Sequence, residues 1–256
     1  MEWQAYEWEF SKEVQAQAAA VTRLEQAVLL IGETGTGHEA VAKYVHSHSR
    51  RARGPFVAIN CGALPDALLA QELVGREKGF DRNAPRASKG MIEHARGGVL
   101  FAYTFEPIGP RSDGVLSRLL EKGEYQADGA GQPITADVRM VVATHRELED
   151  AAVRGEISAD FCERLRGVEI RLPPLRDRHD EILGIAERYL REVCVLFSRR
   201  TTGLAQSARE AILAHNWLGN LHELHTVLES AAFNSDGPEI TADDLPIRVA
   251  GRSTDG

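Results

Sequence analysis

The sequence predicts an α/β domain with a parallel sheet, followed by a small all-helical subdomain. Short apolar runs, the first at 28–31, alternate with helical patterns through the first two thirds of the chain, which is typical of parallel sheets. From Pro173 onward only helical patterns occur. We therefore expect four parts: an aromatic segment and helix at 1–27, the α/β core at 28–174, the helical subdomain at 175–248 and a disordered tail at 249–256.

Length and composition fit an ordinary globular protein. The chain has 256 residues, enough for a core domain with a small satellite. Its formal net charge is -8 at pH 7 and its longest basic cluster, at 49–53, is short, so we expect no direct nucleic-acid binding. The widely spaced cysteines predict neither disulfides nor a metal site. No apolar run approaches the roughly 20 residues of a membrane span, and no signal-peptide pattern occurs, which indicates a cytoplasmic protein.

The chain begins with an aromatic segment, and a helix is predicted directly after it. Ser11 can cap this helix, which should run from Lys12 to about residue 26. We expect the aromatic segment to form a strap over the core, with a docking segment or an adenine-stacking surface as alternatives. Its aromatic residues are Trp3, Tyr6, Trp8 and Phe10.

The remaining elements follow from apolar periodicity. Strands are predicted at 28–31, 55–61, 99–103, 138–144 and 168–172. Core helices are predicted at 39–49, 65–74, 91–96 and 115–123. The polar, glycine-containing stretch 75–90 predicts a surface loop or an inserted hairpin. The subdomain should contain helices at 177–195, 207–215 and 220–233, with no strands.

The turn after the first strand has the composition of a phosphate-binding loop. Gly35 and Gly37 let the backbone approach a ligand closely, and the following helix directs free N–H groups at the turn. The spacing matches G-x-x-x-x-G-K-[ST] but places His38 where a lysine is expected. We assign cofactor binding to eight residues: Gly32, Glu33, Thr34, Gly35, Thr36, Gly37, His38 and Glu39.

Six segments, taken in order, resemble the central AAA+ domain of bacterial enhancer-binding proteins, the ATPases that activate transcription by sigma-54 RNA polymerase. They are Gly32–Gly37, Phe56–Cys61, Glu72–Gly79, Gly97–Phe101, Arg171–Arg178 and Trp217–Leu224. The resemblance covers 28–246. It implies a P-loop core with a parallel sheet, a helical lid, bound ATP or ADP and assembly into a hexameric ring.

Three positions depart from the pattern that hydrolysis needs in this family. The resemblance implies a lysine at His38 that neutralises phosphates, whereas histidine with its ordinary pKa near 6.5 is mostly neutral at pH 7. It also implies an Asp-Glu pair where this chain has Tyr103 and Thr104, so we expect neither Mg²⁺ binding nor activation of the attacking water. Any surviving phosphate binding should tighten as pH falls from about 8 to about 6.

Three smaller sites differ in the same direction. The resemblance implies a sensor asparagine where this chain has His145, and a nucleotide-contacting lid arginine where it has His222. Of two arginines that reach into a neighbouring subunit's site, one is replaced by Ser158. The other is retained as Arg164, a candidate trans finger.

The loop by which the family contacts sigma-54 is altered too. The family's Gly-Ala-Phe-Thr-Gly-Ala sequence retains only its end residues, and the charges of Asp81 and Arg82 oppose insertion of an apolar tip into a partner. The partner loop consists of Gly79, Phe80, Asp81, Arg82, Asn83 and Ala84.

The sequence therefore predicts a degenerate member of the family, a regulatory pseudo-ATPase that acts in transcription by binding. We expect at most weak binding of ATP or ADP, assembly as a homo-oligomer or in a mixed ring with an active AAA+ relative, and contact with the transcription machinery. Two alternatives stay open. One is an ATP-hydrolysing sigma-54-dependent activator with unusual motif residues. The other is a regulator that does not use sigma-54 and senses a nucleotide second messenger such as a cyclic dinucleotide.

Overall fold

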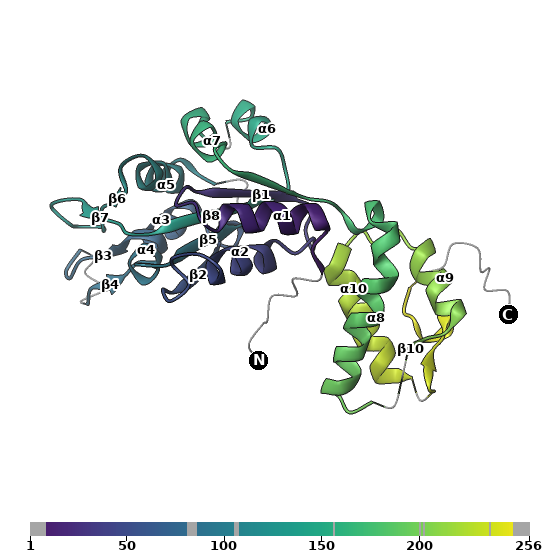
Figure 1. Ribbon diagram of the computed structural model, residues 1–256. Helices are drawn as coiled ribbons and strands as arrows, with labels where there is room; N and C mark the ends of the chain where they lie inside the picture. The colour runs from purple at the N-terminus through teal and green to yellow at the C-terminus, as the bar shows by residue number, and fades with distance from the viewer. Residues whose placement is uncertain are drawn as a thin grey trace. The chain divides into compact units, whose positions relative to one another are not determined.

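The chain forms two compact units. The computed structural model describes residues 9–80, 86–104, 108–155, 157–199, 201, 203–235 and 237–247 (Figure 1). The first unit comprises the chain up to Gly32 together with His38–Leu172. The second combines Glu33–Gly37 with the chain from Pro173 onward. The phosphate-binding loop of the sequence thus belongs to the second unit, although the first unit flanks it in the chain.

The first unit is built on a five-stranded parallel sheet, which confirms the predicted fold class. Its strands pair in the order β2-β5-β8-β1-β9, and every neighbouring pair is parallel. The three central strands β5, β8 and β1 are largely apolar and buried because helices cover both faces of the sheet, whereas the edge strand β9 alternates exposed and buried residues. The strands are β1 (Val28–Gly32), β2 (Phe56–Asn60), β5 (Val99–Tyr103), β8 (Arg139–Thr144) and β9 (Glu169–Leu172).

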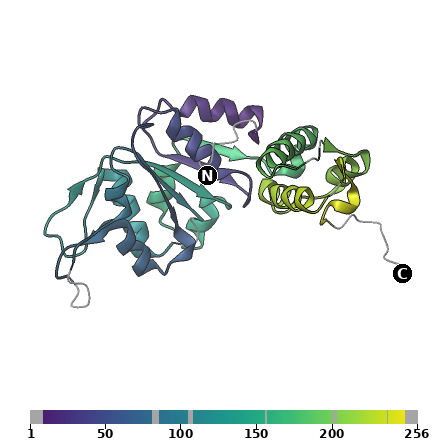
Figure 2. The same cartoon turned by 90° about the horizontal axis from the view of Figure 1, so that it is seen from below.

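Helices form one layer on each face of this sheet (Figure 1, Figure 2). Along β1, Val28 and Leu30 pack with α1 and α2, whereas Leu29 and Ile31 pack with the opposite layer, the two-residue alternation of a strand. The first layer consists of α1 (Lys12–Val21) and α2 (His38–Ser47). The second consists of α3 (Asp66–Val74), α4 (Met91–His94), α5 (Pro110–Lys122), α6 (Leu148–Val153) and α7 (Ala159–Leu165).

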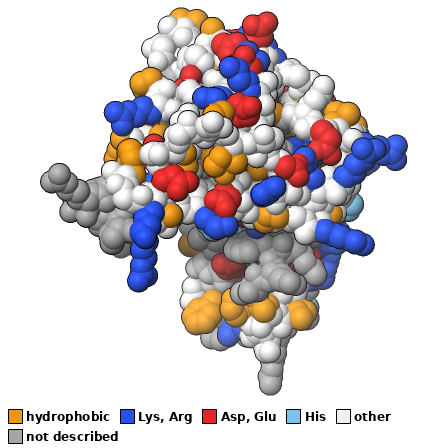
Figure 3. Space-filling model, turned by 90° about the vertical axis from the view of Figure 1, so that its left-hand side faces the viewer, with side chains coloured by type: hydrophobic (Ala, Val, Ile, Leu, Met, Phe, Trp, Pro, Cys, Tyr) orange, Lys and Arg blue, Asp and Glu red, His pale blue; other side chains and the backbone are white. Residues whose placement is uncertain are grey.

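Two short hairpins extend from the first unit. β3 (Gly75–Arg76) pairs antiparallel with β4 (Ser88–Lys89), as the hairpin alternative for this stretch predicts. β6 (Glu124–Tyr125) and β7 (Ile134–Thr135) form a second hairpin that the sequence did not predict. The two are joined by a hydrogen bond from Glu77 N–H to the Asp128 carbonyl (2.8 Å). Figure 3 shows basic and acidic side chains interspersed on the face that carries these hairpins.

Helix α5 begins at Pro110, five residues before the predicted start at Val115. Its first turn is capped from another helix: the Asp66 carboxylate of α3 accepts hydrogen bonds from the N–H groups of Arg111 (3.1 Å) and Ser112 (2.9 Å). A cap supplied from a distant residue leaves no local signal, so apolar periodicity alone predicts a later start for this helix. The sequence does not predict the short helices α6 and α7. They contain six and seven residues, too few for the apolar periodicity of a helix to be recognised.

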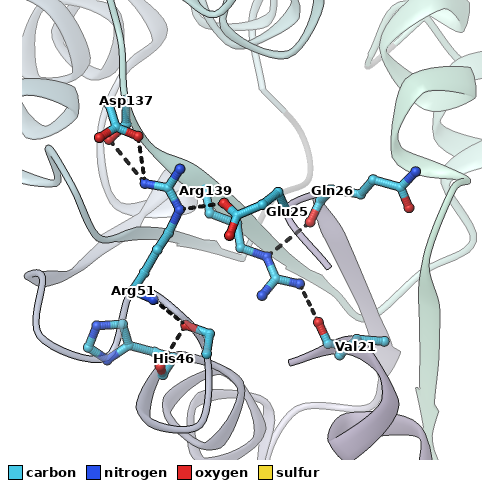
Figure 4. Close-up of polar contacts among 8 residues, drawn as sticks. Val21, Glu25, Gln26, His46, Arg51, Asp137 and Arg139 are labelled. Atoms are coloured by element: carbon cyan, nitrogen blue, oxygen red, sulfur yellow. Dashed lines mark hydrogen bonds and ion pairs between the residues drawn. The ribbon is translucent and has the colours of Figure 1, made fainter. Parts of the chain in front are cut away.

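Helix α1 ends at Val21 rather than near residue 26, and Arg139 at the start of β8 explains why. The buried Arg139 guanidinium donates from Nη2 to the Val21 carbonyl (2.8 Å) and from Nε to the Gln26 carbonyl (3.0 Å) (Figure 4). A cation at the last carbonyls of a helix stabilises its C-terminus. Arg51 lies beside Arg139 and forms ion pairs with two carboxylates, those of Glu25 (2.7 Å) and Asp137 (2.8 Å).

The second unit is mainly helical. It contains α8 (His179–Leu196), α9 (Gln206–Ala214) and α10 (Asn220–Asn234). Trp217 is fully buried and donates its indole N–H to the Ile212 carbonyl (2.8 Å). The prediction of a subdomain without strands is wrong, because β10 (Gly203–Leu204) and β11 (Glu239–Ile240) pair in parallel. Strands of two residues are too short to show alternation in the sequence.

The predictions for the chain ends lie mostly outside the described residues. This holds for Trp3, Tyr6, Trp8 and the tail at 249–256. Phe10 is buried and meets the Tyr44 ring of α2 edge-on, with ring centroids 6.1 Å apart. Every helix in the described part of the chain is too short or too polar to cross a membrane.

Candidate functional site

Three adjacent strands of the sheet end at predicted site residues. Because β5, β8 and β1 are neighbours and parallel, their carboxyl ends share one edge of the sheet. Tyr103 is the last residue of β5 and Thr104 follows it. His145 follows β8, and His38, the first residue of α2, interacts electrostatically with His145. The fold therefore gathers these four residues at one edge.

The His38 imidazole is held in its neutral form. Its Nε2 atom is buried and has no hydrogen-bond partner among the residues that the structure describes. Burial, and then the neighbouring His145, lower the pKa of His38 from 6.5 to about 4. The expected neutrality at pH 7 agrees with this value. Burial therefore moves the titration of the unliganded imidazole below pH 6, and the expected tightening of phosphate binding between pH 8 and pH 6 stays a prediction.

Aromatic packing surrounds the end of β5. The half-buried Tyr103 ring stacks on Phe101, with centroids 5.5 Å apart, and Phe101 stacks on Phe56 at 5.8 Å. Thr104 has a φ of 51°, in the left-handed region that non-glycine residues rarely adopt. Its Cγ2 atom lies so close to Gly62 that a Cβ there would be 2.7 Å away. Tyr103 carries a phenol and Thr104 a hydroxyl, so neither residue presents a carboxylate to a metal ion.

Acidic side chains that could substitute for the missing pair are engaged elsewhere. The Asp113 carboxylate accepts a hydrogen bond from the N–H of Ser158 (3.0 Å). Glu121 forms an ion pair with Arg164 (3.8 Å). Glu106, directly after the strand end, lies outside the described residues.

The two positions assigned to a neighbouring subunit's site both have local contacts. Ser158 caps α7 by accepting a hydrogen bond from Phe161 N–H (3.2 Å). Arg164 pairs with Asp160 one turn earlier (2.9 Å), and its side chain is 34% exposed. Ser158 therefore has a structural task, whereas Arg164 is tethered but accessible.

The glycine loop has the backbone conformation that its sequence predicts. Gly35 and Gly37 have φ values of 85° and 103°, which favour glycine. A Cβ on Gly35 would lie 2.2 Å from the Gly219 carbonyl oxygen, so the loop backbone abuts the turn before α10. Thr36 closes the loop by donating both its N–H (3.2 Å) and its hydroxyl (2.8 Å) to the Glu33 carbonyl.

Two residues that sequence reasoning missed hold this loop. Arg176 forms a two-pronged ion pair with the Glu33 carboxylate, with Nη1 2.7 Å from Oε2. Asn220 donates from Nδ2 to Glu33 Oε2 (3.2 Å) and to the Thr34 carbonyl (3.0 Å). The Arg176 hydrogen bonds dominate over burial and lower the pKa of Glu33 from 4.5 to about 2. Both partners lie in segments that carried the resemblance, but no local pattern connects them to the loop.

The other predicted binding residues lie nearby or are otherwise engaged. His222 of α10 is exposed. It lies beside the loop, because a Cβ added to Gly35 would be 3.3 Å from the Cβ atom of His222. Glu39 is exposed and pairs with Lys43 one turn along α2 (2.7 Å). Of the partner loop, Phe80 is 54% exposed and its ring lies against Gly129. The remaining loop residues Asp81–Ala84 lie outside the described residues.

The donor set fits phosphate better than it fits a metal ion. Positive-φ glycines followed by the start of a ten-residue helix offer backbone N–H groups to an anion. Mg²⁺ prefers carboxylate oxygens, and the end of β5 offers a phenol and a hydroxyl instead. The loop backbone at Gly35 and Gly37 is therefore suited to an anion, whereas Tyr103 and Thr104 at the end of β5 are not the carboxylate ligands that Mg²⁺ prefers.

Comparison with known proteins agrees with this architecture. The Sigma-54 interaction domain matches residues 6–171, and the AAA+ ATPase lid domain matches residues 176–256. The Nif-specific regulatory protein of Azotobacter vinelandii is 39% identical over 227 residues, which cover 89% of this chain and 43% of that protein. The regulatory protein AtoC of Escherichia coli K12 is 35% identical over 231 residues, which cover 90% of this chain and 50% of AtoC.

Solved structures show the same fold. NtrX from Brucella abortus in complex with ADP superposes with a TM-score of 0.83 at 25% sequence identity, covering 91% of this chain and 52% of NtrX. The corresponding ATP complex gives a TM-score of 0.84 and covers 93% of this chain and 52% of NtrX. This chain therefore spans about half the length of these relatives, or less. The matches to the Sigma-54 interaction domain and to the AAA+ ATPase lid domain show that the chain belongs to the Sigma-54 interaction domain family of AAA+ proteins.

Proposed function

We propose that this chain is a degenerate member of its family, a cytoplasmic regulatory pseudo-ATPase that acts in transcription by binding rather than by hydrolysis. One observation carries the proposal. At the edge where β1, β5 and β8 end, neutral His38 stands at the lysine position, and Tyr103 and Thr104 stand at the positions of the two carboxylates.

The chemical losses act on separate steps. A neutral imidazole does not supply the charge-assisted hydrogen bond of a lysine, which contributes about 1.5–3 kcal/mol. The loss of a general base at Thr104 lowers a rate by about 10²–10⁴. The loss of a metal carboxylate at Tyr103 removes a further electrostatic contribution to phosphoryl transfer. With these losses combined, we expect ATP turnover below measurable background.

Weak binding of ATP or ADP is the ligand chemistry that we assign to Glu33–Gly37. The positive φ values of Gly35 and Gly37 support it, and NtrX, which has the same fold, is known in complexes with ADP and ATP. We expect no requirement for Mg²⁺. A cyclic dinucleotide shares the phosphate chemistry and is the alternative ligand, so calorimetric titration with all three compounds separates the assignments.

Assembly is the route by which such a domain would act. Arg164 is accessible and could serve a neighbouring subunit once its pairs with Asp160 and Glu121 are exchanged. We assign it as a trans finger in a homo-oligomer or in a mixed ring with an active relative. The partner loop keeps an exposed Phe80, but the charges of Asp81 and Arg82 make it a poor apolar tip. Contact with the transcription machinery would therefore not occur by insertion of this loop into sigma-54.

A second candidate, an ATP-hydrolysing sigma-54-dependent activator, is favoured by the family membership itself. The deciding experiment compares phosphate release by the wild-type chain and by the triple variant His38→Lys/Tyr103→Asp/Thr104→Glu, with and without Mg²⁺. We expect background release from the wild type and a gain from the triple variant. Mg²⁺-dependent turnover by the wild type that Gly37→Ala abolishes would establish the second candidate instead.

A further inference from the structure

We propose that Asn220 and Arg176 attach the loop Glu33–Gly37 to the lid, the helical second unit. We call these contacts the latch. Because of them, an anion that binds to the loop acts directly on the lid. Asn220 acts as the positioning residue, and Arg176 cancels the negative charge that Glu33 places inside an anion-binding loop. The nucleotide part of this proposal rests on the proposed function, whereas the latch itself stands on contacts within the second unit.

The Asn220 carboxamide joins three segments of that unit. Its Oδ1 accepts a hydrogen bond from Leu175 N–H (2.8 Å), in the turn that leads to α8. Its Nδ2 donates to the Thr34 carbonyl (3.0 Å) and to Glu33 Oε2 (3.2 Å) in the loop. The residue is fully buried, so these groups have little access to water as an alternative partner. One side chain thereby connects the loop, the turn and the start of α10.

The backbone of Asn220 supports the same conclusion. Its φ of 55° is left-handed, and Trp217, three residues earlier in the same turn, has a φ of 48°. Non-glycine residues hold such angles where surrounding contacts over-determine them. Asparagine tolerates this region better than most residues, and its short side chain can reach the loop from there. The close approach of Gly35 to the Gly219 carbonyl adds a steric contact at the same turn.

Arg176 neutralises the negative charge of the Glu33 carboxylate in the loop. A carboxylate in a phosphate-binding loop repels the ligand, and Glu33 is ionised at neutral pH, with its pKa lowered further to about 2 mainly by Arg176. The guanidinium of Arg176 contacts both of its oxygens. The two side chains are 38% and 41% exposed, so the pair by itself contributes little to stability. Its consequence lies in the charge that the loop presents to an anion.

The latch is tested without nucleotide by amide hydrogen exchange on the full chain. Asn220→Gly relieves the left-handed backbone while removing the carboxamide, and Asn234→Gly at the exposed end of the same helix is the matched control. We expect exchange at Thr36 and Leu175 to rise about tenfold or more in Asn220→Gly only, with β1 and α2 unchanged. Unchanged exchange at both amides would overturn the latch. If Asn220→Gly does not fold, a double-mutant cycle of Glu33→Gln and Arg176→Gln replaces it, with the exchange rate of the Thr36 amide as the readout. A coupling energy of zero between the two residues would overturn the latch.

The charge role is tested by rescue, with Mg²⁺-free ADP as the probe. Arg176→Gln should weaken ADP binding about tenfold in a salt-dependent manner, and Glu33→Gln/Arg176→Gln should restore it to within about twofold. A purely structural role for Arg176 would leave the double variant as weak as the single one, which would refute charge cancellation. If the wild type binds no ADP, the nucleotide part of the proposed function fails, while the exchange experiment still decides the latch.

Discussion

The Glu33 carboxylate and the Arg176 guanidinium meet in a two-pronged ion pair, with Arg176 Nη1 2.7 Å from Glu33 Oε2. The pair lies within the second unit, although Glu33 immediately follows a strand of the first. The loop is therefore tied to residues far along the chain, and its charge depends on a residue that no motif of the loop contains.

This pair predicts acid sensitivity of the second unit. The pKa of Glu33 is about 2 in the folded protein and 4.5 by its ordinary value, so the unfolded chain binds the proton first. The stability that the pair contributes, which is small because both side chains are more than a third exposed, is present above about pH 4.5 and is lost as pH falls towards about 2. Trp217 fluorescence in a Trp3→Phe/Trp8→Phe background should report this loss in urea titrations. Glu33→Gln should flatten the pH dependence, whereas Glu147→Gln, which removes an Arg171 partner in the first unit, should not.

His38 predicts a second pH dependence with a different window. Its pKa is lowered by burial, so the unfolded chain takes up a proton near pH 6.5 while the folded protein does so only near pH 4. Stability should therefore fall as pH drops from about 6.5 to about 4 and change little below that, by at most about 3 kcal/mol. His38→Gln should remove this component. An imidazole NMR titration that finds an ordinary pKa near 6.5 would contradict the prediction.

Arg139 predicts a large stability effect at a position without any catalytic task. Arg139→Met keeps a long apolar stem but leaves the carbonyls of Val21 and Gln26 without their buried donor. We expect a loss of about 2 kcal/mol in chemical unfolding. Arg51→Met removes the neighbouring, more exposed ion pairs and should cost less than about 1 kcal/mol. Equal effects of the two substitutions would show that Arg139 is not the anchor of α1.

The proposed assembly predicts an effect on active relatives. Titration of this chain into an active family member should change its ATPase rate and the particle mass together, because a subunit with an empty site enters the ring. Arg164→Gln should retain the mass change and lose any support of the neighbouring site. If the chain runs as a monomer and changes neither quantity at tens of micromolar, the mixed ring is wrong and sensing of a small ligand becomes the better hypothesis.

The sequence predicted the five strands and most helices because both kinds of element leave a local pattern. Val28–Ile31 is apolar throughout because helices cover both faces of the sheet, and the glycines of the loop mark positive φ. The early start of α5 was missed because its cap, Asp66, comes from another helix. The two-residue strands β10 and β11 carry no periodicity at all.

The candidate site was predicted in part for the same reason. His38, Tyr103 and Thr104 stand at motif positions with known spacing, so their departure from the pattern is visible in the sequence. Asn220 and Arg176 reach the loop only through tertiary contacts. The depressed pKa of His38 likewise depends on burial and on His145, neither of which the local sequence specifies.

The anchoring of α1 has a mechanical consequence. Arg139 holds the last turn of α1 at the amino end of β8, and His145 follows the carboxyl end of that strand. Because β8 is the middle strand of the sheet, a pulling force on α1 that is passed on through Arg139 enters the sheet at its centre and not at an edge strand. A segment that pulls on α1 would therefore transmit force along β8 to the edge of the sheet where His145 interacts electrostatically with His38.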